Sequence, residues 1–559
     1  MRKSKSSQPT AQEASDASQE RKMNRTPDKQ PASKTSISQG QPRHSHPIRA
    51  GLAVVAGRTV GALSRRLHLG GGTSIVGIVA QRMYPEIVEH LATQLEHGSV
   101  IVTGTNGKTT TSSFIAAIMK DAGLSVWHNR EGSNLMRGIA SSLVIRAHPN
   151  GRLKRSGRAI SILEVDEATL PQAVHAVVPR VAVFTNLFRD QLDRYGEVDS
   201  VTTRWQQAIA MLPPETTLIL NADDPTTAQL GANFRGKVLY YGIDDLSLDL
   251  QTQEQTTQRH QVIDTRSCSN CGNDYLYQAR FYSHMGHYTC THCEQRRPQP
   301  DVRALTIHSD SFDRQRLTIA TKENQQREVV LPLPGLYNIY NALAAVTAVT
   351  ALNVDWEPIT TGIEQSKPVF GRGERIQMEG RTVRLLLAKN PTGFNEVLRT
   401  LFANETPQHV LFVLNDNTAD GRDVSWIWDV DFERAVGNTR TLVLAGTRAR
   451  DLALRLKYAG IAQENMTIIP NAPLKIQKQA IMREERTAGA KKQRRLTAKV
   501  IESKLPDAYG VKKAILTAVA QTPVGETLFV VPTYTGLLEI HRELEQRGLT
   551  PHFWEGRDA

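Results

Sequence analysis

The feature that most constrains the fold of this chain is a glycine-rich segment, TGTNGKTTT, at Thr103–Thr111. It follows the apolar, strand-like run Ser99–Val102 and precedes the helix-patterned run Ser112–Met119. A glycine-rich turn between a strand and a helix, ending in Gly-Lys-Thr, is typical of a loop that binds phosphate through backbone N–H groups. The spacing between Gly104 and Gly107 is shorter than in the common P-loop. The sequence therefore predicts a variant phosphate loop in an α/β fold.

This loop is expected to bind a nucleoside triphosphate. Its backbone N–H groups can point at the phosphates, Lys108 can bridge the outer phosphates, and Thr109 can bind Mg²⁺. The alternative, an ordinary turn between a strand and a helix, is disfavoured. The predicted ATP-binding residues of the loop are Gly104, Thr105, Asn106, Gly107, Lys108, Thr109 and Thr110.

Acidic side chains at the ends of two later strands support a Mg·ATP site. The segment Ile162–Glu167 runs from an apolar strand into acidic residues, and Val183–Asp193 does the same at the next strand. Open α/β sheets gather their ligands at the carboxyl ends of the strands. Because acidic residues there often only cap helices, each segment alone is weak evidence. Together with the phosphate loop they predict Mg·ATP binding.

Short β-rich runs alternate with helix-patterned stretches in two parts of the chain. From Val100 to about Gly242 the alternation predicts a mostly parallel sheet with helices on both faces. After Arg372 a second alternation predicts a Rossmann-like α/β domain. The predicted strands are Ser99–Val102, Ser125–His128, Ala159–Val165, Val181–Thr185, Thr217–Asn221 and Val238–Tyr241, then Thr382–Ala388, Val410–Asn415, Thr441–Ala445, Asn465–Ile469 and Thr527–Pro532. Between them, residues 304–333 are β-rich and a helix is expected from about Pro334 to Leu352.

The length of 559 residues is too great for a single core and indicates two or three domains. We predict a disordered tail at residues 1–48, because this segment is rich in Ser, Gln, Lys and Pro and poor in large apolar residues. A central ATP-binding domain is expected at 49–370 and a C-terminal Rossmann-like domain at 371–559. A basic insertion at about 483–504 is expected to be a solvated helix or loop.

The net charge of +12 comes mostly from residues 1–49 and 480–504. The rest of the chain is nearly neutral, so the charge pattern does not indicate nucleic-acid binding by the folded body. The apolar run Ala50–Gly57 is too short to cross a bilayer and predicts a helix packed on the first domain. A peripheral contact with the inner face of the membrane is the alternative, because Arg65, Arg66 and His68 follow. We expect a cytoplasmic protein.

The four cysteines of the chain form two Cys-x-x-Cys pairs separated by 18 residues. Each pair can present two thiolates from one tight turn, and two such turns close a tetrahedral zinc site without an open position. The sequence therefore predicts a structural zinc ribbon at about residues 262–300 rather than a catalytic zinc. Disulfides are the alternative, which a cytoplasmic setting disfavours. The predicted ligands are Cys268, Cys271, Cys290 and Cys293.

Other residues of the ribbon bear on its role. Nearby His284, His287 and His292 are expected to pack or form hydrogen bonds rather than bind the metal. Zinc ribbons often bind nucleic acids, but the segment Tyr275–Tyr288 contains one Arg and no Lys. We therefore expect a structural role.

Several motifs, taken in order along the chain, resemble those of the Mur ligases. These ATP-dependent, amide-forming enzymes of peptidoglycan synthesis are related to folylpolyglutamate synthases. The resembling segments are Thr103–Thr111, the strand that ends at Glu164, Thr185-Asn186, Asn221–Asp224, Pro334–Ala345 and Gly371–Glu374. The resemblance implies that a substrate carboxylate attacks the γ-phosphate of ATP and that an amine captures the resulting acyl phosphate.

The resemblance also implies roles for individual residues. It assigns phosphate binding to Lys108 and Mg²⁺ binding to Thr109 and Glu164. Asn338 and Asn341 would lie near the nucleotide base. The remaining implied ATP-binding residue, at the hinge between the domains, is Arg372.

The sequence departs from the Mur ligase pattern in three places. Gln191 replaces a usual His, and no Lys follows between Leu187 and Gly236 to be carbamylated, so the resemblance does not extend to the family's second-metal arrangement. The C-terminal motif occurs as Leu386–Pro391 and lacks its Asp. Because about fifty plausibly ordered residues precede the loop, a full N-terminal UDP-sugar domain is not expected.

A narrower resemblance is to the MurT family, the ligase-like subunits of lipid II isoglutaminyl synthases. It rests on the ribbon, on Leu387–Pro391 and on the acid-rich segment Leu414–Glu433. It implies amidation of the α-carboxylate of D-glutamate in the lipid II stem peptide, with ammonia from a separate glutaminase subunit, GatD. It also implies that Asp423 completes the Cys-His pair of that subunit. Three other acids of the segment, Asp420, Asp429 and Asp431, are weaker candidates.

Two other functions remain open from the sequence. The chain could be a stand-alone ligase that adds an amino acid, as in folylpolyglutamate synthesis. It could instead be an ATP-regulated zinc-ribbon scaffold or a nucleic-acid binder. The acid-rich segment could also simply cap a helix and pack Trp426 and Trp428.

Overall fold

The structure is a computed structural model that describes residues 46–66, 73–129, 134–154, 156–190, 198–250, 265, 267–368, 370–403, 406–471 and 510–550. The predicted tail at 1–48 lies outside these residues except for its last three positions, and Pro47 already begins helix α1. The basic insertion at 483–504 and Gln191 also lie outside the described residues.

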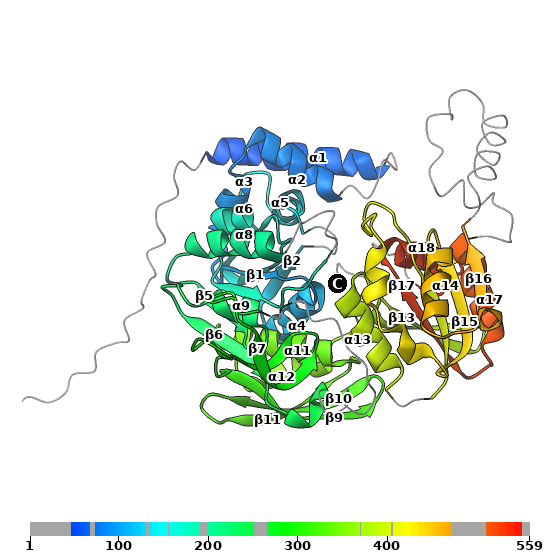
Figure 1. The fold of residues 1–559 in the computed structure, drawn as a ribbon. Helices are drawn as coiled ribbons and strands as arrows, with labels where there is room; N and C mark the ends of the chain where they lie inside the picture. Colours follow the sequence, from blue (N-terminus) through cyan, green and yellow to red (C-terminus); the bar gives the residue numbers. More distant parts are fainter. Residues whose placement is uncertain are drawn as a thin grey trace, which may run out of the picture. The chain divides into compact units, whose positions relative to one another are not determined.

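A sheet of nine strands forms the first part of the fold, in the order β11-β10-β9-β6-β5-β4-β1-β3-β2 (Figure 1). The strands from β2 to β9 along this order pair in parallel, and β9, β10 and β11 form an antiparallel end. Their bounds are β1 Ser99–Thr103, β2 Ser125–His128, β3 Ala159–Glu164, β4 Val181–Phe184, β5 Thr217–Asn221, β6 Val238–Ile243, β9 Val302–Ser311, β10 Arg314–Thr321 and β11 Gln326–Leu331. The predicted parallel sheet is confirmed.

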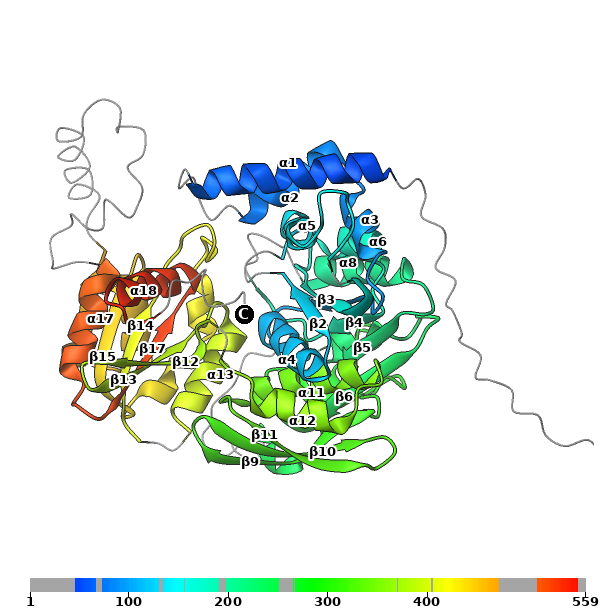
Figure 2. The same ribbon diagram turned by 180° about the vertical axis from the view of Figure 1, so that it is seen from behind.

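Helices cover both faces of this sheet because alternate strand residues point to opposite sides. In β1, Val100 and Val102 belong to one buried cluster and Ile101 to the other. Figures 1 and 2 show the helices on either side. The first cluster holds residues of α4 Lys108–Asp121, α11 Leu336–Thr350 and α12 Trp356–Glu364. The second holds residues of α1 Pro47–Arg66, α2 Thr73–Met83, α3 Ile87–Ala92, α5 Met136–Ile145, α6 Leu170–Val177 and α8 Val198–Ala210.

The cysteine-rich insertion forms a two-stranded antiparallel hairpin of β7 Tyr275–Tyr282 and β8 Met285–Cys290. The cysteine turns lie at its open end, and its closed end inserts into the core of the first part. There Phe281, Tyr282 and Met285 are buried in the same cluster as α4 and α11. The insertion is therefore packed into the domain rather than attached to its surface.

A second sheet follows, with strand order β12-β13-β17-β14-β15-β16. All of its pairs are parallel except β12 with β13. Its strands are β12 Arg372–Met378, β13 Arg381–Leu386, β14 Gln408–Val413, β15 Thr439–Gly446, β16 Thr467–Pro470 and β17 Thr527–Pro532. Its helices are α13 Pro391–Leu401, α14 Ala449–Tyr458, α17 Gly510–Gln521 and α18 Tyr534–Gln546. Two buried clusters on its two faces show that this sheet also has helices on both sides.

Candidate functional site

The two glycines of the phosphate loop are required by their surroundings. Gly104 has a φ of 136°, and a Cβ there would lie 2.0 Å from Thr185 Oγ1. Gly107 has a φ of 88°, and a Cβ there would lie 2.0 Å from Asn341 Oδ1. The loop thus presses against the end of β4 on one side and against α11 on the other, which leaves no space for a side chain at either position.

Residues after β4 hold the loop in place. The backbone N–H of Thr105 donates to Asn186 O at 2.9 Å, and the N–H of Asn106 donates to Asn186 Oδ1 at 2.9 Å. The hydroxyl of Thr185 donates to Asn106 O at 2.7 Å. Two loop N–H groups are therefore used within the protein. The first N–H groups of α4, which have no acceptor inside the helix, are the ones that can bind an anion.

Lys108 begins α4 and is buried beneath the loop. Its Nζ donates to Glu167 Oε1 at 2.8 Å, to Thr105 O at 3.3 Å and to Gly104 O at close range. Burial alone would lower the pKa of Lys108, but the charges of Glu167 and then Glu164 outweigh it and raise the pKa above its ordinary value. This ammonium therefore stays charged at neutral pH, as phosphate binding requires.

Three buried carboxylates lie close to this single ammonium: Glu164, Asp166 and Glu167. They leave an excess of negative charge in a buried place, which favours a bound divalent cation. Asn129 fixes the backbone of Glu164 by two hydrogen bonds, donating to its O at 2.7 Å and accepting from its N–H at 2.8 Å. Thr109, the predicted hydroxyl ligand, is buried at the start of α4. This donor set of carboxylates and hydroxyl fits Mg²⁺.

Asn338 and Asn341, on α11, form a pair beside the loop. Asn341 Nδ2 donates to Asn338 Oδ1 at 3.2 Å, and Thr111 Oγ1 donates to Asn341 Oδ1 at 3.4 Å. Asn338 also donates to Pro334 O at 2.7 Å. The structure thus brings Asn341 to the loop, next to Gly107, and Asn338 contacts Asn341.

Arg372 opens β12, where the second sheet begins. Its Nε is buried and has no hydrogen-bond partner in the part of the chain that the structure describes. An arginine nitrogen in this state needs an acceptor, which a phosphate oxygen could supply.

The variant motif Leu387–Pro391 also reaches the first sheet. Lys389 Nζ donates to Asp190 Oδ2 at 2.6 Å. Asn390 caps α13 by accepting from Gly393 N–H at 2.8 Å, and its Nδ2 donates to Asn106 Oδ1 at 3.1 Å. Residues of the second sheet therefore contact both the phosphate loop and the segment that holds it.

The two cysteine pairs lie in two turns with the same hydrogen bonding. Cys268 N–H donates to Asn273 O at 2.7 Å, and Cys290 N–H donates to Gln295 O at 2.7 Å. In the second turn, the backbone N–H groups of His292 and Cys293 each donate a hydrogen bond to Cys290 Sγ, at 3.4 Å. Each turn thus fixes its two sulfur atoms in place.

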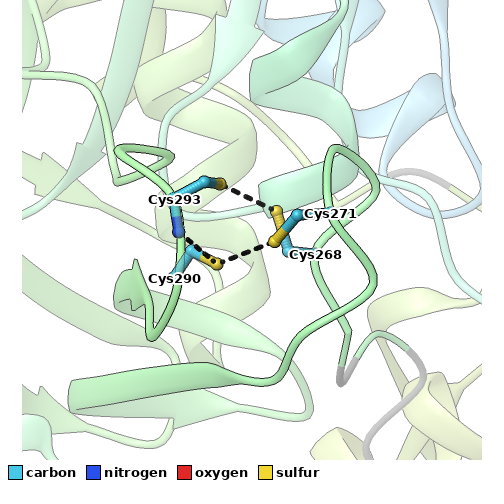
Figure 3. A group of neighbouring side chains, drawn as sticks. All are labelled: Cys268, Cys271, Cys290 and Cys293. Atoms are coloured by element: carbon cyan, nitrogen blue, oxygen red, sulfur yellow. Dashed lines mark hydrogen bonds between the residues drawn. The ribbon is translucent and has the colours of Figure 1, made fainter.

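The four cysteine sulfur atoms face one another across these turns (Figure 3). All lie within 4.8 Å of one another, with 3.7 Å between the sulfurs of Cys268 and Cys293 and 3.4 Å between those of Cys271 and Cys290. Tetrahedral coordination at a Zn–S distance of roughly 2.3 Å requires edges of roughly 3.8 Å. The arrangement therefore fits a four-thiolate metal site.

His284 lies at the closed end of the hairpin, as a packed residue rather than a ligand. Its side chain is fully buried, with its ring 4.7 Å from that of Phe188. Its Nε2 is 3.4 Å from Asp224 Oδ1, and Asp224 Oδ2 accepts from Leu187 N–H at 2.8 Å. The expectation that His284 packs is confirmed. The same contacts link the hairpin to the segment after β4 that holds the phosphate loop.

The four acids of the segment 414–433 differ in their partners. Asp420 is buried and accepts from Thr535 N–H at 2.8 Å, and burial raises the pKa of its carboxyl. Asp429 pairs with Arg189 at 3.0 Å and Asp431 with Arg434 at 2.7 Å. These three carboxylates therefore have partners within the chain.

Asp423 is exposed, on the loop that precedes the short helix Ser425–Asp429. Its Oδ1 accepts from Ser425 N–H at 2.8 Å. Hydrogen bonds from the backbone and hydroxyl of Ser425 hold the pKa of Asp423 below its usual value. Asp423 is thus an ionised, exposed carboxylate that a partner could reach.

Comparison with known proteins places these features in a family. The family described as Mur ligase middle domain matches residues 102–349, and that described as MurT ligase C-terminal matches residues 387–490. The lipid II isoglutaminyl synthase (glutamine-hydrolyzing) subunit MurT of Staphylococcus aureus (strain COL) is 33% identical over 73% of this chain and 87% of that protein. The chain belongs to the MurT family of Mur ligases.

Other relatives agree with the MurT assignment. The subunit MurT of Streptococcus pneumoniae (strain ATCC BAA-255 / R6) is 32% identical over 76% of this chain and 90% of that protein. Among solved structures, a pseudomurein peptide ligase type C from Methanothermus fervidus superposes with a TM-score of 0.53 at 21% identity, covering 81% of this chain and 79% of that one. A UDP-N-acetylmuramoylalanyl-D-glutamyl-2,6-diaminopimelate--D-alanyl-D-alanyl ligase from Acinetobacter baumannii gives 0.54 at 16% identity, covering 84% and 80%. These structures confirm the Mur ligase fold.

Several site residues were not assigned from the sequence. Glu167, the partner of Lys108, was seen only as one acid in a run of three, and nothing in the run distinguished it. Asn129 was not singled out, and Asp190 was seen only as one acid of the segment Val183–Asp193, because their contacts with Glu164 and Lys389 depend on chain positions far apart in sequence. An amide at the end of β2, beside the strand that carries Glu164, could have pointed to Asn129.

Proposed function

We propose that this chain is the ATP-dependent amidating subunit of a two-subunit lipid II isoglutaminyl synthase. The substrate would be the α-carboxylate of the D-glutamate in the lipid II stem peptide. The product would be D-isoglutamine, with ammonia supplied by a GatD-like glutaminase. Two MurT relatives, each matched over most of its length, support this function. The observation that carries the chemistry is the buried Lys108, held between the phosphate loop and three carboxylates.

The proposed reaction has two steps. An oxygen of the substrate carboxylate attacks the γ-phosphorus of ATP, the bond to the β-phosphate oxygen breaks, and ADP leaves. Ammonia then attacks the acyl carbon, inorganic phosphate leaves, and the nitrogen loses a proton to solvent or phosphate. Lys108 and the N-terminal N–H groups of α4 would bind the phosphate charge that shifts in the first step. Mg²⁺, bound by Thr109 and Glu164, would neutralise phosphate charge.

Further proposed ATP contacts surround the loop. We assign the remaining ATP contacts to Asn341, which lies beside Gly107, to Asn338, which pairs with Asn341, and to Arg372, whose buried Nε has no hydrogen-bond partner among the described residues. We also propose a structural Zn²⁺ in the cysteine cluster, supported by the sulfur separations.

The proposed domains are a central domain at 49–370 and a C-terminal, Rossmann-like domain at 371–559, supported by the separate sheets.

The ammonia-supplying partner is proposed to dock near Asp423. A glutaminase that uses a Cys-His pair needs a third group to orient its imidazole, and an exposed carboxylate can serve from a second chain. Close to Asp423 in sequence, Trp428 is 51% exposed and meets Tyr458, which is 72% exposed, edge to face, with ring centroids 5.6 Å apart. Exposed aromatic residues of this kind are typical of protein interfaces.

The test compares sources of nitrogen. The purified chain is given lipid II and ATP with ammonium, with glutamine, with glutamine plus a glutaminase partner, or with a free amino acid. We expect amidation with ammonium and with glutamine plus partner, and no product with glutamine alone. Product formed with an amino acid in place of ammonia would instead establish the stand-alone ligase.

A further inference from the structure

Helix α1 has an apolar stripe on its outward face. Along the helix, exposed positions follow a spacing of three or four residues, so they lie on one side. The opposite side, with Ala50, Ala53 and Val54, is buried against the first α/β part. The exposed apolar residues of the stripe are Ile48 (78%), Leu52 (57%), Val55 (43%) and Leu63 (54%). The helix is therefore apolar on two sides, and the described structure covers one of them.

Helix α2 adds apolar surface next to α1. The two helices pack closely, since a Cβ at Gly57 would lie 2.7 Å from Val76 O. Figures 1 and 2 both show α1 along the outer edge of the first part, with α2 beside it. On α2 the exposed apolar residues are Ile75 (37%), Ile78 (44%) and Met83 (49%).

The charge of this helix pair has one sign. Residues 47–85 contain five Arg and no Asp or Glu. Arg49 and Arg66 are exposed near the two ends of the stripe, and Arg82 is exposed on α2. An apolar face flanked by cations matches the surface of a bilayer with anionic headgroups, where apolar side chains enter the acyl boundary and arginines contact phosphates.

We propose that the α1–α2 face docks on the surface of an anionic phospholipid bilayer. Among the described residues, no helix is long and apolar enough to cross a membrane. The helix pair therefore lies in the interface, parallel to the membrane plane. A second copy of the chain is a poorer occupant, because two such faces would bring the exposed Arg49, Arg66 and Arg82 of each copy together without a counter-charge from the helix pair. The proposal does not depend on the proposed ligase reaction, since none of these residues belongs to the nucleotide site.

Vesicle flotation of the full-length chain, without ATP or substrate, tests the proposal. Vesicles of phosphatidylcholine with roughly one third phosphatidylglycerol are compared with pure phosphatidylcholine. The wild-type chain should bind the anionic vesicles more strongly, and less so as salt rises. The double variant Leu52→Glu, Leu63→Glu should lower the partition coefficient about tenfold or more, because both leucines leave the bilayer. The matched control is Val524→Glu, a 70% exposed residue before β17, which should bind like wild type.

Two further readouts separate membrane docking from other effects. The variant Arg49→Gln, Arg66→Gln should weaken binding to anionic vesicles and leave the melting temperature unchanged, since both side chains are exposed. All of these variants keep residues 1–46, so a loss of binding reports on the helix face. Unchanged binding by the Leu52→Glu, Leu63→Glu variant would overturn the proposal. A wild-type dimer that this variant converts to monomer without vesicles would also overturn it and make the stripe a contact between copies.

Discussion

Gly107 shows how one residue connects the phosphate loop to the rest of the site. Its backbone is left-handed, and the space that a side chain would need is occupied by the amide of Asn341 on α11. The motif predicted a tight loop, but the need for glycine comes from a neighbour more than two hundred residues away in sequence. The loop and α11 are therefore fitted to each other.

Gly107→Ala is expected to weaken ATP binding about tenfold or more, because the new Cβ displaces Asn341 and moves the start of α4. The control is Gly123→Ala, where φ is a similar 82° and no atom of the described residues lies within 4 Å of the added Cβ. Calorimetric titration with ATP should show near-normal affinity for this control. Equal losses in both variants would mean that backbone strain, and not the contact with Asn341, explains the effect.

Lys108 and Asp423 were predicted from motifs, and their surroundings were not. The pattern Gly-Lys-Thr predicts a lysine at the loop, but the pairing with Glu167 depends on how β1 and β3 align. For Asp423, the sequence offered four similar acids, and burial distinguishes them. Burial of a polar residue depends on tertiary packing, which a single sequence does not show directly.

At the scale of elements, the cysteine-bearing hairpin β7–β8 is connected to the phosphate loop. From its buried tip, His284 contacts Asp224, Asp224 accepts from Leu187 N–H, and the segment that includes Leu187 holds the loop through Thr185 and Asn186.

Most strand positions were predicted to within two residues, because apolar runs between turn signals determine them. The insertion of the hairpin tip into the core was not predicted, because the burial of Phe281, Tyr282 and Met285 depends on tertiary packing against α4 and α11.

Removal of metal by a chelator is expected to lower both the melting temperature, by about 4 °C or more, and the affinity for ATP, because the hairpin tip would lose its support. Thermal unfolding and ATP titration with and without chelator provide the measurement. The variant with all four cysteines changed to Ser is the control and should not respond to chelator. A lower melting temperature with unchanged ATP affinity would contradict the connection through His284.

At the scale of the whole molecule, residues of both sheets contribute to one site. Lys389 pairs with Asp190, and Asn390 contacts Asn106 of the loop. Asp190 is mostly buried, so removal of Lys389 would leave its charge without this partner. The motif around Lys389 was identified from the sequence, but its contact partner was not, because the two parts of the chain fold as separate sheets.

Lys389→Met and Asp190→Asn are each expected to lower the rate of ammonia-dependent amidation about tenfold. The double variant should be little worse than either single one, with a coupling of about 1 kcal/mol or more. The coupling is calculated from the initial rates of the wild type, the two single variants and the double variant. Additive losses would show that the two side chains act independently. Removal of a charged surface pair, Arg316 with Asp310, by the same kind of substitutions serves as the control and should leave the rate unchanged.

The central proposal is that one chain activates the carboxylate at Lys108 and completes the active site of a partner glutaminase through Asp423. The most direct measurement follows glutamine hydrolysis and lipid II amidation, with glutamine or with ammonium, in the complex of this chain with its glutaminase. Lys108→Ala should abolish amidation from both nitrogen sources and largely keep glutamine hydrolysis. Asp423→Asn should abolish glutamine hydrolysis and keep amidation from ammonium. Full hydrolysis by Asp423→Asn, or amidation from ammonium by Lys108→Ala, would contradict the account.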